Sequence, residues 1–277
     1  MPPDYQQPSK LEVMPLPTPL LDAAQSGRVI PFIGAGFSKV FSLPSWSELI
    51  DEVAADMDLD PDIASLYGDF LQLAEYLAIH QNGIGKLRSR LDPQFNSPSL
   101  DISTSEAHLL LTRLGAKTIY TTNWDNLIEK AFDHEGMNIN KIVTIDDFLE
   151  ANPDRTSVVK LHGDFSSDDS LVFTESSYFE RMDFESPLDI RLRSDMLGNV
   201  LLFVGYSLSD FNIRYMWFKL QKLIRQTASL RRRDPFAYIV LRGRNPIFED
   251  ICRHSRDIDV IFLNPASPQD SLIEILQ

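Results

Sequence analysis

The chain has a single cysteine among its 277 residues, Cys252, and five histidines. A lone thiol cannot form a disulfide within the chain or a zinc ribbon of four thiolates. One cysteine is also typical of a protein kept in a reducing compartment, so we expect a cytoplasmic location. Because the histidines show no metal-ligand spacing, we expect no metal site.

Long apolar runs and an excess of positive charge are also absent. No run reaches the roughly 18–20 apolar residues of a membrane-spanning helix, and residues 1–8 lack the features of an export signal. The 26 Lys and Arg against 40 Asp and Glu leave a net charge of −14. Such a chain is repelled by phosphate backbones and anionic lipids, so we expect no direct nucleic-acid or membrane binding.

What remains is a globular composition, with 43% hydrophobic and 24% charged residues. Residues 1–19 are rich in proline and lack periodicity, which predicts an extended N-terminal arm. We expect residues 20–277 to form a single domain. Within it, residues 57–115 have apolar side chains at helical spacing and no strand candidate, which predicts a helical insert.

Short apolar runs with β-branched members predict strands, and helical segments alternate with many of them. The runs are residues 28–33, 117–122, 142–145, 158–161, 201–204, 237–241 and 260–263. Strands of this kind, apolar on both faces, are typical of a sheet covered by helices on both sides. The sequence therefore predicts an α/β fold with a Rossmann-like, doubly wound and mostly parallel sheet.

Polar or glycine-rich segments follow several of these runs directly. They are residues 34–38, 121–125, 162–164 and 205–210. In a doubly wound sheet, ligands bind in the crevice beyond the carboxyl ends of the strands. We therefore expect these segments to line one ligand site.

The first such segment is Gly34-Ala35-Gly36. Glycines after a buried strand let the backbone turn sharply and approach a phosphate closely, although a tight turn that binds nothing is an equal alternative. The segment lacks the third glycine of the G-x-G-x-x-G fingerprint, because position 39 is lysine. It also lacks G-K-[ST], which disfavours a P-loop ATPase.

Asn123 and Asp125 follow the strand over residues 117–122, and either of them could simply cap the next helix. Their amide and carboxylate could equally bind a polar ligand, with Thr122 adding a hydroxyl. Ser207 offers a hydroxyl to phosphate or ribose, and Asp210 is placed to bind a ribose hydroxyl or to cap a helix.

His162 follows the strand over residues 158–161 and precedes Gly163. It therefore projects from a strand end rather than from a helix face. Because the ordinary pKa of histidine lies near neutral pH, this position suits a general base.

Together, these segments resemble the NAD-binding domain of sirtuins in their order and in their placement at strand ends. The amino-acid sequence at residues 121–125 and 205–210 is most similar to that of the sirtuin-like NAD⁺ hydrolases (NADases) of bacterial anti-phage defence. The resemblance covers residues 27–265. It implies a Rossmann-like fold and NAD⁺ as the substrate, with no metal.

The same resemblance implies a role for each matching residue. His162 would act as the base, Asn123 would hold the attacking water or the ribose, and Asp125 would hold the nicotinamide carboxamide. The remaining positions that it assigns to NAD⁺ are Gly34, Ala35, Gly36 and Ser38 for the pyrophosphate, and Gly205 and Ser207 for the adenosine side.

The implied function is cleavage of NAD⁺ to nicotinamide and ADP-ribose by the effector of an abortive-infection system. Such an activity needs control, so we expect a separate sensor subunit or assembly into a homo-oligomer. The alternative is a non-catalytic NAD-binding or ADP-ribose-binding regulatory subunit. An NAD-dependent deacylase is the third choice, because the four-cysteine zinc module that deacylating sirtuins carry is absent from this sequence.

Overall fold

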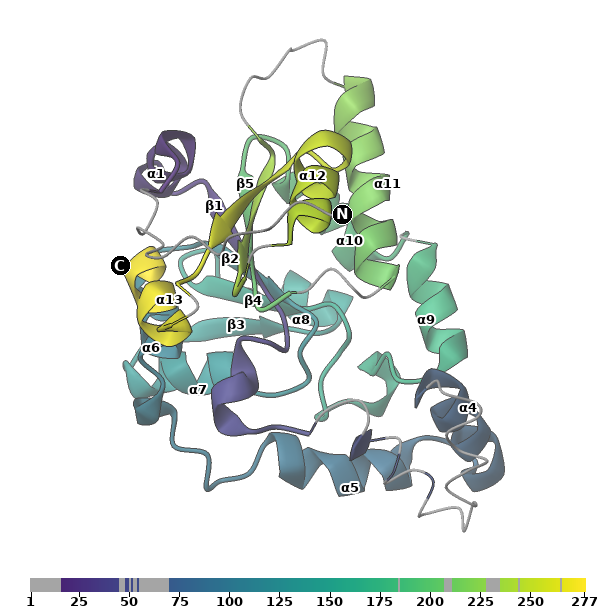
Figure 1. Ribbon diagram of the computed structural model, residues 1–277. Helices are drawn as coiled ribbons and strands as arrows, with labels where there is room; N and C mark the ends of the chain where they lie inside the picture. Colours follow the sequence, from purple (N-terminus) through teal and green to yellow (C-terminus); the bar gives the residue numbers. More distant parts are fainter. Residues whose placement is uncertain are drawn as a thin grey trace, which may run out of the picture.

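The computed structural model describes residues 16–44, 48–49, 51, 54, 70–183, 185–206, 211–227, 235–243, 245–264 and 266–277. Its centre is a seven-stranded sheet in the order β3-β4-β2-β1-β5-β6-β7 (Figure 1). The strands are β1 (Val29–Ile33), β2 (Thr118–Thr121), β3 (Ile139–Ile142), β4 (Thr156–Lys160), β5 (Val200–Val204), β6 (Ala237–Leu241) and β7 (Ile258–Phe262). All of these neighbours pair in parallel, which confirms the expected doubly wound α/β fold.

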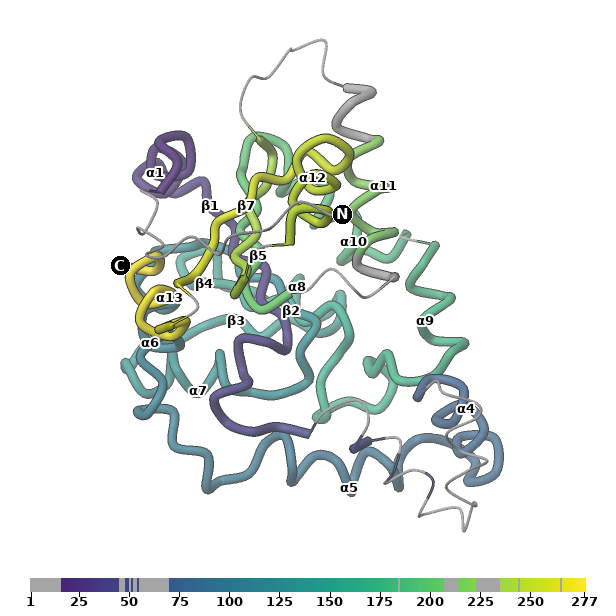
Figure 2. Tube along the Cα trace, viewed as in Figure 1, coloured from purple at the N-terminus to yellow at the C-terminus, as the bar shows by residue number. Residues whose placement is uncertain are grey.

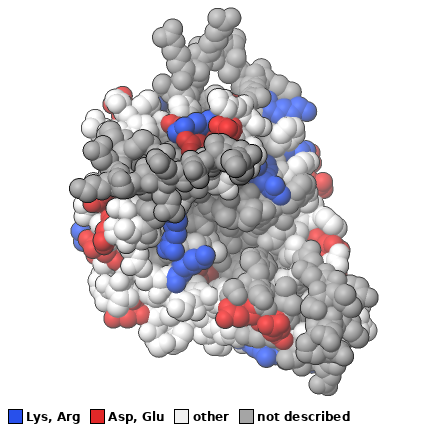
Figure 3. Space-filling model, in the orientation of Figure 1, with Lys and Arg blue, Asp and Glu red and all other residues white. Residues whose placement is uncertain are grey.

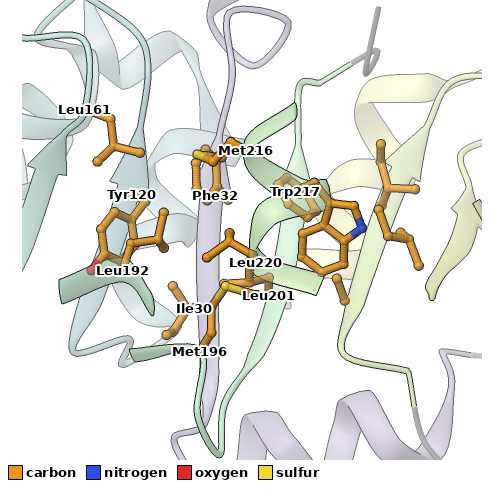
Figure 4. Packing of buried hydrophobic residues seen from close by; sticks show 14 of the residues in the cluster. Ile30, Phe32, Tyr120, Leu161, Leu192, Met196, Leu201, Met216, Trp217 and Leu220 are labelled. Carbon is orange, nitrogen blue, oxygen red and sulfur yellow. The ribbon is translucent and has the colours of Figure 1, made fainter. Parts of the chain in front are cut away.

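One face of the sheet is covered by helices from the second half of the chain. They are α8 (Ile145–Leu149), α10 (Pro187–Asp195), α11 (Phe211–Thr227) and α12 (Pro246–Ser255). Phe32 lies at the centre of this layer, between Tyr120 of β2 and Trp217 of α11 (Figure 4). Trp217 is 2% exposed, as expected for a core tryptophan, and its indole donates to the carbonyl of Arg256.

The other face is covered by α1 (Thr18–Gln25), α6 (Glu106–Arg113), α7 (Leu127–His134) and α13 (Pro268–Leu276). Ile33 of β1 packs into this layer, whereas its neighbour Phe32 packs into the first, because successive side chains of a strand point to opposite faces. The C-terminal helix α13 lies beside α6 (Figures 1 and 2).

A third apolar cluster lies beyond the sheet faces and joins two helices to the segments after β2 and β4. The helices are α4 (Phe70–Gln81) and α5 (Gly85–Phe95), and α9 (Glu175–Met182) contacts α4. In this cluster Trp124 stacks on Phe173 with ring centroids 4.4 Å apart, and Phe165 packs beside them. This packing holds the segments that follow β2 and β4 against α4 and α5.

The predicted boundaries of the arm and the insert stay predictions. Helix α1 begins at Thr18, inside the expected arm, and residues 1–15 lie outside the described part. Helices α4, α5 and α6 lie within the expected insert, of which residues 57–69 are not described. In the described residues, no helix is long and apolar enough to cross a membrane.

The strand expected over residues 142–145 is wrong. The strand β3 ends at Ile142, and Thr144 begins helix α8 instead. The Thr144 hydroxyl accepts the backbone N–H of Asp147, and the Asp147 carboxylate accepts the backbone N–H of Thr144. This capping box satisfies backbone donors that a continued strand would have directed to a neighbouring strand.

The strand order places a switch in chain direction at the centre of the sheet. From β1 the chain moves to β2 on one side, whereas from β5 it moves to β6 on the other. Because β1 and β5 are neighbours, the connections that leave their carboxyl ends lead toward opposite edges of the sheet. This is the place where doubly wound sheets bind ligands.

Candidate functional site

The loops after β1 and β5 pack backbone against backbone. The N–H groups of Gly34 and Gly36 donate to the carbonyls of Val204 and Gly205, each at 2.9 Å. A Cβ at Gly36 would lie 2.7 Å from the Gly205 oxygen. Gly205 has a φ of +78°, and a Cβ there would lie 2.4 Å from the Phe37 nitrogen.

This packing explains why both loops need glycine before any ligand is considered. The N–H groups of Gly34 and Gly36 already have carbonyl partners, so they are not the donors that would cradle a phosphate. Ala35 is exposed between them. A pyrophosphate site at residues 34–36 stays a prediction, and it would use other donors of these loops.

Tyr206 joins the end of β5 to the end of β2, a contact that the sequence did not reveal. Its phenol lies 2.6 Å from the hydroxyl of Thr122. Its ring packs edge-on against Phe32 and Phe203, with centroids 5.4 and 5.9 Å away. Tyr206 therefore bridges strand ends that lie on either side of β1.

Ser38, Asn123 and Asp125 form a buried polar cluster at the ends of β1 and β2. Ser38 donates to Oδ2 of Asp125 at 3.0 Å, and Nδ2 of Asn123 donates to the Ser38 hydroxyl at 3.3 Å. These side chains are at most 7% exposed. The structure thus brings together residues that the sequence predicted separately for one site.

Asp125 combines the two roles that the sequence left open for it. Its Oδ1 accepts the backbone N–H of Leu127 at the start of α7, which is a capping contact, while Oδ2 accepts from Ser38. Burial raises the pKa of Asp125, and the nearby charge of Lys160 works against this rise. Because both carboxylate oxygens have partners, Asp125 would meet a ligand only with its remaining lone pairs.

Asn123 is the member of the cluster that has bonding capacity to spare. Its backbone N–H donates to the hydroxyl of Thr121, which in turn donates to the carbonyl of Ile33. Its Oδ1 is buried and has no hydrogen-bond partner among the described residues. An unpaired buried carbonyl costs about 1–3 kcal/mol, so this atom is poised to accept a hydrogen bond from a ligand.

His162 lies at the end of β4, next to the strand that carries Asn123. Thr121 and Lys160 are paired in register, and Asn123 and His162 each follow two residues later. The ring packs edge-on against Tyr178, with ring centroids 5.2 Å apart. Burial, with the positive charge of Arg181, lowers the pKa of His162 to about 3, so the ring is neutral at physiological pH.

Lys160 is a buried charged residue of this region that sequence reasoning missed. Its side chain is 0% exposed. Its ammonium donates to the carbonyl of Asp125 and to Oδ2 of Asp164, each at 2.7 Å, and pairs with Glu129 at 3.2 Å. The available signal was a lysine between the apolar residues Val159 and Leu161 in a strand predicted to be buried.

Ser207 and Asp210 lie outside the described residues, so their predicted roles stay predictions. His108 is buried, and its ring packs against Phe37 with centroids 4.3 Å apart. The described residues hold no group of His, Cys, Asp or Glu arranged for a metal ion.

The face drawn in Figure 3 carries both signs of charge among the described residues. On the face drawn in Figure 3, Lys and Arg side chains form small groups among acidic and uncharged residues of the described part. The expectation that this acidic chain does not bind nucleic acid directly stays a prediction.

Comparison with known proteins defines the class of this fold and site. The family model described as a SIR2-like domain matches residues 117–261, just over half of the chain. The match includes the segments that carry Asn123, Asp125, His162 and Gly205. The chain belongs to the SIR2-like family.

Relatives in this family carry names that describe an activity or a biological role. One is NAD(+) hydrolase ThsA of Acinetobacter baumannii, 31% identical over 67% of this chain and 37% of its own length. Another is Defense-associated sirtuin 2 of Bacillus subtilis, 28% identical over 73% of this chain and 20% of its own length. This chain therefore spans well under half the length of these relatives.

A third relative, NAD(+) hydrolase ThsA of Cytobacillus dafuensis, is 29% identical over 74% of this chain and 40% of its own length. It has the same name as the Acinetobacter baumannii protein, and that name describes hydrolysis of NAD(+).

Proposed function

We propose that this protein hydrolyses NAD⁺ to nicotinamide and ADP-ribose. The observation that carries the proposal is the unpaired Oδ1 of Asn123, buried beside Ser38 and Asp125 at the carboxyl edge of a SIR2-like sheet. A buried acceptor without a partner fits a site that is completed by a hydroxyl or water. The names of the NAD(+) hydrolase relatives support NAD⁺ as the substrate.

The reaction consumes water and releases one proton. The bond between nicotinamide and the ribose anomeric carbon breaks, its electron pair goes to the nicotinamide nitrogen, and the water oxygen bonds to the carbon. Nicotinamide leaves as a neutral molecule, so little acid catalysis is needed at the leaving group. What the protein must do is orient the ribose, stabilise its developing positive charge and place the water.

Asn123 and His162 are suited to the last two tasks. The Asn123 side-chain oxygen would accept a hydrogen bond from the attacking water or from a ribose hydroxyl. This oxygen is the negative end of the C=O dipole, and it would face the cationic ribose. The His162 ring is neutral, so a nitrogen lone pair is available to take a proton as water adds. The lowered pKa makes the free ring a weaker base than the sequence predicts, because general-base catalysis is most efficient when the pKa lies near the working pH.

The biological role in this proposal is that of a cytoplasmic effector of anti-phage defence that depletes NAD⁺. The name of the relative Defense-associated sirtuin 2 supports the defence role. Free NAD⁺ hydrolysis would harm the host cell, so a sensor subunit or assembly into a homo-oligomer would hold the activity in check. The longer relatives leave room for such control outside the segment that this chain matches.

The test measures release of nicotinamide and ADP-ribose from NAD⁺ by chromatography. Wild type is compared with His162→Ala, Asn123→Ala and the control His254→Ala, which changes an exposed histidine in α12. We expect turnover to fall at least 100-fold in the first two variants and to stay unchanged in the control. Thermal unfolding of each variant checks that the domain is intact.

The assay also separates the competing functions. NAD⁺ binding without turnover, with every neighbouring gene product added, would replace the proposal with a regulatory NAD-binding subunit. Nicotinamide release only in the presence of an acyl-lysine peptide would replace it with a deacylase. Hydrolysis that appears only with one neighbouring protein would identify that protein as the sensor.

A further inference from the structure

We propose that Lys160 is a positioning residue that sets the placement of Asn123 relative to His162. The inference deepens the proposed NAD⁺ hydrolysis and rests on it. It begins from the geometry of a single ammonium group that contacts the segments on both sides of the site. Neither the sequence pattern nor the expected NAD⁺ contacts assign a role to this side chain.

The first set of contacts reaches the segment that carries Asn123. Lys160 Nζ donates to the carbonyl of Asp125 at 2.7 Å and to that of Trp124 at 3.3 Å. These carbonyls follow directly after Asn123, in the turn between β2 and α7. The same ammonium pairs with Glu129 of α7 at 3.2 Å, so it also fixes the helix into which this turn runs.

The second contact reaches the segment that carries His162. Asp164 accepts from Lys160 at 2.7 Å, and it lies two residues beyond His162. Asp164 is itself held by the backbone N–H of Ser166 at 2.8 Å and by Lys141 at 3.2 Å. In the chain, His162 thus lies midway between Lys160 and Asp164, the carboxylate that accepts from Lys160.

A simple structural role explains this arrangement poorly. Burying a charged group is costly, and apolar side chains of similar volume often stabilise a protein just as well. An ammonium, in contrast, has three N–H donors, and here they connect the segment after β2 to the segment after β4. We therefore infer that Lys160 fixes the distance between the segments that carry Asn123 and His162. The rate of the reaction depends on where these two residues lie relative to each other.

The first experiment measures loop order directly and needs no activity. Amide hydrogen exchange of residues 123–127 is compared in wild type, Lys160→Met and the control Lys141→Met. Lys141 pairs with the same Asp164 and also donates to Ser166, both in the segment after β4. We expect exchange at least tenfold faster in Lys160→Met and unchanged in Lys141→Met.

The second experiment measures where the reacting groups lie. NAD⁺ is cleaved in water that contains methanol, and the ratio of ADP-ribose to methyl ADP-ribose is determined. In both products the acceptor oxygen bonds to the anomeric carbon and its proton is released. Because both products form at the same site of the folded enzyme, their ratio does not depend on how much enzyme is folded. We expect Lys160→Met to change this ratio at least threefold and to lower kcat at least tenfold, with KM within threefold.

If Lys160→Met does not fold, the variant Lys160→Met/Glu129→Gln/Asp164→Asn removes the unpaired carboxylates and takes its place. Unchanged exchange in the folded variant would overturn the inference. So would faster exchange with an unaltered product ratio, or an equal change in Lys141→Met. A wild type that never cleaves NAD⁺ would refute the proposed function, while the exchange experiment would still decide whether Lys160 orders the turn.

Discussion

The Ser38 hydroxyl donates to Oδ2 of Asp125 at 3.0 Å, although 87 residues separate them in the chain. One follows β1 and the other follows β2, and both side chains are buried. The same hydroxyl also accepts from Asn123, so a single serine orders the carboxylate and the amide of the candidate site. This contact makes the loop after β1 part of the site.

Replacing this serine tests its role as an organiser. In Ser38→Ala both contacts are lost and the Asp125 carboxylate stays buried with one partner fewer, which costs about 1–3 kcal/mol in free energy of unfolding. We expect NAD⁺ turnover to fall as well, because the Asn123 side-chain amide loses the hydroxyl that it donates to. Urea unfolding and the chromatographic assay measure the two effects, and Ser89→Ala on the exposed side of α5 is the control. Wild-type turnover in Ser38→Ala would contradict the role.

The close approach of the loops after β1 and β5 predicts that Gly205 cannot be replaced. An alanine there combines a φ of +78° with a Cβ that would lie 2.4 Å from the Phe37 nitrogen. We expect Gly205→Ala to destabilise the fold by more than about 2 kcal/mol, as strain in a special backbone conformation does.

The matched control for Gly205 is Gly243→Ala, which has open space around the added methyl group. Its free energy of unfolding should stay within about 0.5 kcal/mol of wild type. Thermal or urea unfolding of the two alanine variants measures the difference. Equal stabilities would show that the loops move apart without cost.

The hydrogen bond between Thr122 and Tyr206 predicts energetic coupling across β1. Tyr206→Phe keeps the ring against Phe32 and removes only the phenol oxygen, while Thr122→Val removes the partner hydroxyl. We expect a coupling energy of about 0.5–1.5 kcal/mol in a double-mutant cycle on unfolding. Strictly additive effects would mean that the 2.6 Å contact does not contribute to stability.

Acid should destabilise the protein through its buried histidines. Burial lowers the pKa of both His108 and His162 to about 3, whereas the pKa in the unfolded chain is about 6.5. Between these values the unfolded state binds more protons, so the stabilisation is complete above pH 6.5 and is lost as the pH falls toward 3. Each histidine contributes a slope of about 1.4 kcal/mol per pH unit.

Carboxylates modify this pH dependence in opposite directions. Burial raises the pKa of Asp125, which favours the folded state as the pH falls, whereas Lys160 outweighs burial at Asp164 and holds the pKa of Asp164 well below its ordinary value. Urea unfolding between pH 7.5 and 5 measures the net slope. His108→Gln should lower the slope by about 1.4 kcal/mol per pH unit, which corresponds to one proton. An unchanged slope in His108→Gln would show that His108 is protonated when folded.

Much of the sheet could be predicted because its central strands are apolar on both faces. Val200–Val204 is buried at every position and reads as a continuous apolar run. The edge strand β3 was misplaced because Asn140 and Lys141 are polar, and the apolar pattern points instead to the residues after it. An edge strand has one neighbour and partial exposure, so burial leaves a weaker mark on its sequence.

The site could be predicted only as a set of segments. Glycines and polar residues directly after buried strands indicated where a ligand would bind, since parallel strands end at one edge. Lys160 is a single polar residue in an otherwise apolar stretch, and the sequence does not indicate which carbonyls its ammonium binds. Tyr206 likewise gave no sign that its phenol would bond to Thr122.

The sequence by itself determined the alternation of strands and helices and the polar or glycine-rich segments that follow the central strands, because both depend on local apolar patterns and on residue type. Only the tertiary structure decided the strand order, the glycine-against-glycine packing of the loops and the partners of Ser38 and Lys160. These depend on which strands become neighbours. That choice is made by the burial of whole faces of the sheet, to which residues far apart in the chain contribute jointly.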